Sequence, residues 1–150
     1  MSSIIESYKD LIYTIEQAIP FNRVLGIHLE EVTEENVTLS FEMRPDLVGN
    51  FGDSRLHGGV ISAAIDVVGG MAALVAVLGR IADHEGALAG FRKLGTIDLR
   101  VDYLRPGVGK KFFCHGHVIR AGGRVAVVRM EFLNDEGLEI AVGTATYIVG

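Results

Sequence analysis

Apolar side chains in the first nineteen residues recur at steps of three and four, the spacing of one helix face. Ser3 followed by Glu6 has the form of a capping box, which marks a helix start. Pro20 ends this predicted amphipathic helix, and the segment PFNRVLG is expected to form a short helical turn. The apolar positions are Ile4, Ile5, Tyr8, Leu11, Ile12, Ile15 and Ile19.

The longest apolar run extends from Val60 to Leu78, where Ser62 and Asp66 are the only polar side chains. A membrane span needs about 20 such residues, so length alone permits one. An acid near the middle of a span costs at least about 2.5 kcal/mol, however, and strand-like segments flank the run on both sides. The pattern therefore favours a helix that a sheet surrounds, since such a helix is apolar on every side.

Extended segments precede and follow this run. IHLEEVTEE and NVTLSFEMR are predicted to form a hairpin that turns at Glu34-Glu35-Asn36. The charged segment RIADHEGALAGFRK is expected to be a loop. Four further strands are predicted in LGTIDLRVDYL, KKFFCHGHVIR, RVAVVRMEFLN and LEIAVGTATYIV, with turns at Pro106-Gly107, Gly122-Gly123 and Asp135-Glu136-Gly137.

The first of these four strands alternates between apolar and polar residues, so its two faces are expected to differ. One predicted face carries Ile97, Leu99, Val101 and Tyr103, and the other carries Thr96, Asp98, Arg100 and Asp102. The whole order predicts an α+β fold in which an antiparallel sheet wraps around one long apolar helix. A length of 150 residues suits a single domain over residues 1–150.

Charge and cysteine content narrow the class of protein. A net charge of −5 without any block of Lys or Arg argues against nucleic acid or an anionic membrane as partner. The single cysteine, Cys114, cannot form an internal disulfide, and the first residues do not resemble a secretory signal. We therefore expect a cytoplasmic protein.

The segment before the apolar helix, VGNFGDSRLHGGVISAAIDVVGG, holds the candidate chemistry. His57-Gly58-Gly59 stands where the helix begins, so backbone N–H groups there lack intrahelical acceptors. Such donors and the helix dipole suit the oxyanion that forms when a carbonyl is attacked. The alternative is a glycine turn that only connects a strand to the helix.

Asp66 is an acid in an otherwise apolar helix, which favours a functional role as a general base or a nucleophile. It could instead cap a neighbouring helix or pair with an arginine. Gly58 and Asp66 are eight residues apart, or about 12 Å along a helix axis. Because both must reach one substrate, we expect a composite site in a homodimer or a dimer of dimers.

The segment from Asn50 to Asp66, with an acid nine residues after His57, resembles the signature of the PaaI-like branch of hotdog-fold thioesterases. The resemblance covers nearly the whole chain and is greatest for the YigI-type acyl-CoA thioesterases. It implies a hotdog fold and hydrolysis of medium- or long-chain acyl-CoA, with an aryl group as an alternative. The segments that carry it are PFNRVLGI, LVGNF, LHGGVISAAIDV, GTIDLRVDYLRPG, RAGGRVAVVRMEF and ATYIVG.

The resemblance also implies roles for individual residues. Asp66 matches the catalytic acid, and Gly58 matches the residue whose N–H polarises the thioester carbonyl. Asn50 matches a loop residue that orients the thioester or the acid, and it stands seven residues before His57, one more than in many members. Thr96 matches the residue that holds the attacking water. His57 is expected to fix the turn or to take part in the chemistry.

Substrate contacts and cofactors complete the expectations. Gly59 lies where the substrate approaches the helix start, and the cations Arg105, Lys110, Lys111, Arg120 and Arg124 either meet the CoA phosphates or are ordinary surface charges. No metal or redox cofactor is required, and CoA enters only as part of substrate and product.

Other chemistry is less favoured by the pattern. The pair His115 and His117 lacks an evident third ligand for a metal, and Cys114 alternates with apolar neighbours as a packed side chain would. The remaining functional alternatives are a non-catalytic acyl-CoA binding module and, on the same fold, a hydratase or dehydratase.

Overall fold

The computed structural model describes residues 4–81 and 83–150, so the predicted capping residue Ser3 lies outside the described residues. The helices are α1 (Ile4–Ala18), α2 (Pro20–Leu25), α3 (Gly58–Val77) and α4 (His84–Lys93), with short 3-10 turns at Pro45–Leu47 and Leu78–Arg80. The strands are β1 (His28–Val32), β2 (Asn36–Glu42), β3 (Val48–Asn50), β4 (Arg55–Leu56), β5 (Gly95–Tyr103), β6 (Lys111–Ala121), β7 (Val125–Asn134) and β8 (Glu139–Ile148).

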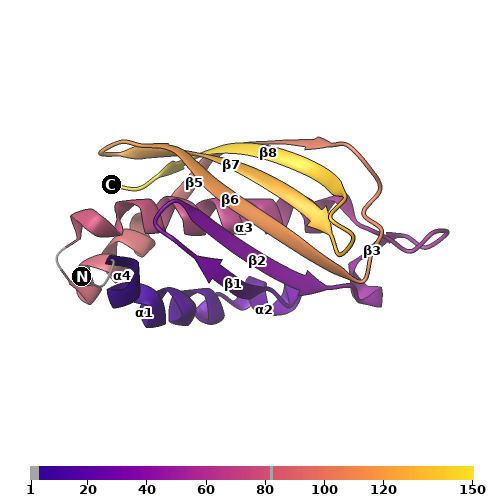
Figure 1. Ribbon diagram of the computed structural model, residues 1–150, viewed down its shortest axis with the longest axis horizontal. Helices are drawn as coiled ribbons and strands as arrows, with labels where there is room; N and C mark the ends of the chain where they lie inside the picture. The colour runs from indigo at the N-terminus through magenta and orange to yellow at the C-terminus, as the bar shows by residue number, and fades with distance from the viewer. Residues whose placement is uncertain (1–3, 82) are drawn as a thin grey trace.

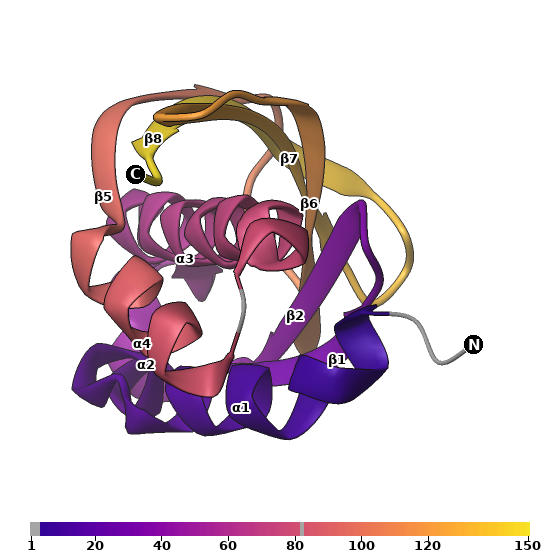
Figure 2. The ribbon, with the colours of Figure 1, turned by 90° about the vertical axis from the view of Figure 1, so that its left-hand side faces the viewer.

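Six of these strands form one antiparallel sheet in the order β1-β2-β6-β7-β8-β5. The sheet curls around α3, which runs along its concave face (Figure 1). Figure 2 shows that α1, α2 and α4 close the side of α3 that the sheet leaves open. This arrangement is the hotdog fold, and the predicted hairpin and the four later strands are confirmed.

The apolar run is the core helix of the protein, which confirms the prediction of a helix enclosed by a sheet over the alternative of a membrane span. Its buried residues include Ile65, Val68 and Leu74, each at most 1% exposed. The sheet contributes its own buried apolar side chains to the core around this helix, among them Phe41 on β2 and Phe112 on β6. Enclosure by the sheet explains why this helix lacks a polar face.

The prediction of a loop between this helix and the next strand is wrong, because ten of its residues form α4. Asp83 caps the helix, its Oδ1 accepting the Gly86 N–H at 2.7 Å. Ala87 is fully buried against the core. The segment was predicted as a loop because it is rich in charged residues, but it forms a short amphipathic helix with the acid Asp83 as its N-cap.

Candidate active site

The start of α3 leaves one backbone donor open. His57 is the N-cap, and its Nδ1 accepts the Gly59 N–H at 2.8 Å. The Val60 and Ile61 N–H groups both donate to the His57 carbonyl oxygen. Among residues 4–81 and 83–150, no acceptor receives a hydrogen bond from the Gly58 N–H. The arrangement gives His57 a structural task and leaves the predicted oxyanion donor, Gly58, without a competing acceptor.

Tyr103, which sequence reasoning did not select, lies against this helix start. Its hydroxyl donates to the Gly58 carbonyl oxygen at 2.8 Å, although the side chain is half exposed. A hydrogen bond from β5 to the first helical residue fixes the peptide next to the open amide. Tyrosine at the end of a strand gives no sequence signal for such a contact.

Asn50 lies near the same end of α3, at the close of β3. Its Oδ1 accepts the Gly52 N–H at 3.0 Å, so the side chain stabilises the turn of the β3–β4 hairpin. The next residue, Phe51, is 98% exposed at the tip of this hairpin, which projects from the body of the protein (Figure 1). The hairpin therefore presents a large apolar side chain at the surface of the chain.

Asp66 is half-buried in the middle of α3 and accepts two side-chain hydrogen bonds at the same oxygen. Thr96 Oγ1 donates to Asp66 Oδ1 at 2.8 Å, and the Tyr147 hydroxyl donates to the same atom at 3.1 Å. The Tyr147 hydroxyl also lies 2.9 Å from the Asp66 carbonyl oxygen. Burial, and then the negative charge of Asp66, raise the pKa of Tyr147 well above its ordinary value. Tyr147 is therefore a protonated donor at neutral pH.

A β-bulge brings Thr96 to Asp66 and corrects the predicted faces of β5. Thr96 pairs with Tyr147 and Asp98 pairs with Thr146, which leaves Ile97 as the extra residue. The bulge reverses the alternation, so Thr96 shares the helix-facing side with Leu99 instead of opposing it. Ile97, which strict alternation placed on the same face as Leu99, is 56% exposed.

A cavity of about 180 Å³ adjoins Asp66, Thr96 and Tyr147. Its walls come from α2 and the residue before it, from α3, from the end of α4 and the start of β5, and from β8, and they are mainly apolar. The apolar lining residues include Phe21, Val67, Gly70, Met71, Phe91 and Leu94. The carboxylate of Asp66 thus stands at the edge of a pocket that suits a short stretch of hydrocarbon.

The predicted residues fall into two separate groups within one protomer. Asn50, His57, Gly58 and Gly59 gather at the first turn of α3, while Asp66 and Thr96 meet about 12 Å further along the helix. No hydrogen bond among the described residues links the two groups. One protomer therefore does not assemble the whole predicted set around a single atom.

The arginines expected to meet phosphate are also divided. Arg105 follows β5 and donates to the Glu139 carbonyl oxygen at 2.8 Å. Arg120 and Arg124 flank the turn between β6 and β7, at the opposite end of β6. All three side chains are exposed, and Arg105 lies at the other end of the sheet from Arg120 and Arg124.

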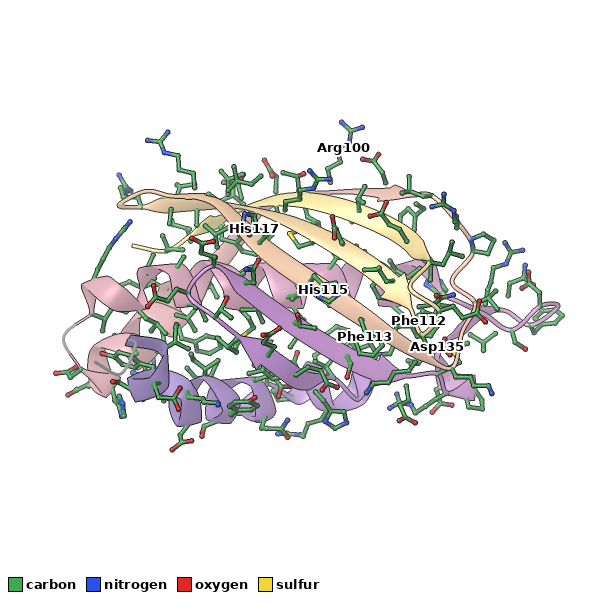
Figure 3. The ribbon with its side chains drawn as sticks, in the orientation of Figure 1. Arg100, Phe112, Phe113, His115, His117 and Asp135 are labelled. Carbon is green, nitrogen blue, oxygen red and sulfur yellow. The ribbon has the colours of Figure 1, made fainter. Side chains whose placement is uncertain are left out.

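The remaining candidates have structural surroundings. Cys114 is 1% exposed, and burial raises the pKa of its thiol. His115 and His117 lie along β6 (Figure 3) and contact β2, through Thr38 Oγ1 at 2.9 Å and Asn36 Oδ1 at 2.8 Å. Within the described part of the chain, no group of three or more His, Cys, Asp or Glu residues could hold a metal ion.

Comparisons with known proteins agree with this fold. The profile of the thioesterase superfamily matches residues 54–141, more than half of the chain. The chain is 47% identical to the medium/long-chain acyl-CoA thioesterase YigI of Escherichia coli over 88% of its own length and 86% of the relative's.

Solved structures give the same result. A Shewanella oneidensis protein related to the thioesterase superfamily superposes with a TM-score of 0.91 at 42% identity, covering 98% of this chain and 97% of its own. A putative thioesterase from Syntrophus aciditrophicus gives a TM-score of 0.87 at 41% identity, with 99% and 100% covered. Sequence profile, relatives and fold together place this chain in the thioesterase superfamily.

Proposed function

We propose that the protein hydrolyses acyl-CoA thioesters and that Asp66 is its catalytic carboxylate, acting as general base or nucleophile. The observation that carries this proposal is a carboxylate held by Thr96 and Tyr147 at the edge of an apolar pocket. A carboxylate so placed can accept a proton from water, or attack a thioester carbon, beside a site for the acyl chain. The similarity to a medium/long-chain acyl-CoA thioesterase supports the same activity.

As a general base, Asp66 takes a proton from a water molecule while the water oxygen attacks the thioester carbon. The tetrahedral oxyanion collapses and expels the CoA thiolate, which receives the proton from Asp66. The products are a carboxylic acid and free CoA. As a nucleophile, a carboxylate oxygen of Asp66 attacks the thioester carbon, the C–S bond breaks and CoA leaves as the thiolate. Water then cleaves the mixed anhydride, which restores the Asp66 carboxylate and releases the carboxylic acid, and the remaining proton of the water goes to the thiolate. The hydroxyl hydrogen of Thr96 is already donated to Asp66, so Thr96 can bind a water molecule only by accepting a hydrogen bond from it.

The oxyanion donor is proposed to come from a second copy of the chain. Gly58 and Asp66 are about 12 Å apart along α3, too far for one thioester. Strand β5 is an edge of the sheet and leaves Ile97 and Tyr103 more than half exposed. An unpaired edge with apolar side chains suits a copy of itself. The resulting homodimer would bring the Gly58 N–H of one copy toward Asp66 of the other.

The acyl chain is proposed to occupy the 180 Å³ pocket, with α4 as part of its enclosure. Arg105, Arg120 and Arg124 are proposed as contacts for the CoA phosphates. Because these arginines lie at opposite ends of the sheet, Arg105 would serve a different substrate molecule, or a different part of it, from the other two. To test this, Arg105 is replaced by alanine in one variant, and Arg120 and Arg124 in another. A variant with a raised KM for acyl-CoA, but not for acyl-pantetheine, would assign its arginines to phosphate binding.

The activity is tested by measuring thiol release from acyl-CoAs of increasing chain length. Asp66→Asn should lower kcat by about a hundredfold to ten-thousandfold, the usual contribution of a general base. Full activity of Asp66→Asn excludes its catalytic role. Tight acyl-CoA binding without thiol release by the unmodified protein would instead identify a binding module.

The composite site is tested by mixing two inactive variants. Asp66→Asn and a Gly58→Pro variant, which lacks the N–H, each carry one intact half of the site. Heterodimers should regain activity because one of their two sites is complete. Absence of recovery in confirmed heterodimers contradicts the shared site.

A further inference from the structure

Two hydroxyl donors converge on one oxygen of Asp66, and this arrangement selects the other oxygen for chemistry. Oδ1 accepts from Thr96 at 2.8 Å and from Tyr147 at 3.1 Å. Within residues 4–81 and 83–150, no hydrogen bond or ion pair reaches Oδ2. We infer that Tyr147 is a positioning residue for Asp66: together with Thr96 it anchors Oδ1 and leaves Oδ2 as the reacting atom. This inference rests on the proposed function.

The register of the sheet places the two donors side by side. Thr96 on β5 and Tyr147 on β8 are cross-strand partners, so their side chains point to the same face. The bulge at Ile97 is what turns Thr96 toward this face. Both hydroxyls therefore approach Asp66 from the sheet, and the carboxylate plane is held from that one side.

Tyr147 is suited to hold the carboxylate rather than to react. Its side chain is 1% exposed, and burial raises the pKa of the phenol, so it stays a donor across the working pH range. The hydroxyl has one hydrogen and two acceptors, Asp66 Oδ1 and the Asp66 carbonyl oxygen. When Asp66 has taken a proton and no longer attracts a donor strongly, the same hydrogen can turn to the carbonyl oxygen while the ring stays in place.

Gly69 provides the space that this tyrosine occupies. A Cβ atom at Gly69 would lie 2.9 Å from Tyr147 Cζ and 3.0 Å from Cε2, and closer still to the hydroxyl oxygen. Any larger side chain at this position displaces the hydroxyl. The glycine one turn after Asp66 thus belongs to the same arrangement as the tyrosine.

The experiment measures kcat and KM for Tyr147→Phe, with Tyr8→Phe as the matched control. Tyr8 is also a buried tyrosine that donates to a backbone carbonyl, that of Ile81, but it lies away from Asp66 and its pocket. Tyr147→Phe should lower kcat by about tenfold to a hundredfold, the range for losing a hydrogen bond to a charged group, and leave KM within about twofold. Tyr8→Phe should keep the kcat of the unmodified protein.

Repeating both replacements in the Asp66→Asn background separates positioning from a structural effect. Tyr147→Phe should cause no further loss there, because its effect passes through the carboxylate. An equal loss in both backgrounds, an unchanged kcat, or a change in KM alone overturns the inference. If Asp66→Asn is itself fully active, the catalytic role proposed for Asp66 fails and the inference with it, whereas an inactive Asp66→Asn with a fully active Tyr147→Phe refutes the inference alone.

Gly69→Ala tests the same geometry without removing a polar group, should Tyr147→Phe fail to fold. Thr96, Asp66 and Tyr147 all remain, but the phenol is displaced. The variant should lose kcat to a similar extent as expected for Tyr147→Phe, again with little change in KM. A Gly69→Ala protein that is folded and has unaltered kcat contradicts the positioning role.

Discussion

The two adjacent glycines of α3 should respond to alanine with opposite signs, which tests the packing beside Asp66 independently of any activity. Both Gly69 and Gly70 are buried in the middle of the helix. An alanine in a helix interior is more favourable than glycine by about 1 kcal/mol, so the intrinsic effect is stabilising at both positions. The surroundings of the added methyl group decide the result.

At Gly69 the methyl carbon would lie 2.9 Å from Tyr147 Cζ and closer still to the hydroxyl oxygen, so the phenol has to move by about an ångström to reach an ordinary contact. Overpacking costs about 1 to 3 kcal/mol, and the close approach to the hydroxyl oxygen places Gly69 in the upper part of this range, so a net loss of about 1 to 2 kcal/mol remains after the helix gain. At Gly70 the nearest atoms are Tyr147 Cε1 at 3.6 Å and Leu94 Cδ2 at 3.7 Å, which are ordinary contacts. The helix gain is therefore kept at Gly70.

Thermal unfolding of the two variants gives the comparison. For a chain of this size about 1 kcal/mol corresponds to roughly 2 to 4 °C in Tm. Gly69→Ala should lower Tm by about 2 to 8 °C, and Gly70→Ala should raise it by about 2 to 4 °C. A Gly69→Ala protein as stable as the unmodified chain, or a Gly70→Ala protein destabilised to the same degree, would refute the placement of the Tyr147 ring.

Three further predictions concern the pocket, the cysteine and one surface ion pair. Val67→Phe should shift the preferred acyl-CoA down by about two methylene groups, because the ring fills part of the 180 Å³ pocket; an unchanged chain-length profile would place the acyl chain elsewhere. Burial raises the pKa of the Cys114 thiol, so a chromogenic disulfide should label it only after denaturation, and rapid labelling of the folded protein would contradict this burial. The Ser40 hydroxyl and then the Lys111 ammonium lower the pKa of the Glu30 carboxyl, so Glu30 stabilises the fold above its unfolded pKa and this contribution is lost as pH falls through the folded value. Glu30→Gln should accordingly lower Tm at pH 7 by an amount that shrinks to nothing in strongly acidic buffer, and a pH-independent difference would disprove the linkage.

The sequence alone predicted the main elements of the fold and singled out Asp66 as the candidate for chemistry. Its three-and-four spacing predicted α1, and the uninterrupted apolar run predicted α3 as a helix enclosed by a sheet. These predictions succeeded because burial imposes a periodicity that each segment carries by itself. Asp66 and the His57-Gly58-Gly59 turn were noticed for a related reason. Each interrupts the apolar pattern of this helix, one with a charged side chain and the other with two adjacent glycines.

Tertiary structure decided which residues meet Asp66. Tyr147 reads in the sequence as one more strand residue, and only the pairing of β8 with β5 brings its hydroxyl to the carboxylate. The bulge at Ile97 reversed the predicted side of Thr96, because strict alternation holds only while the register is unbroken. Contacts such as these join residues that are distant in the chain, and their geometry is set by register, curvature and the space that Gly69 leaves, none of which a local pattern of apolar and polar residues records.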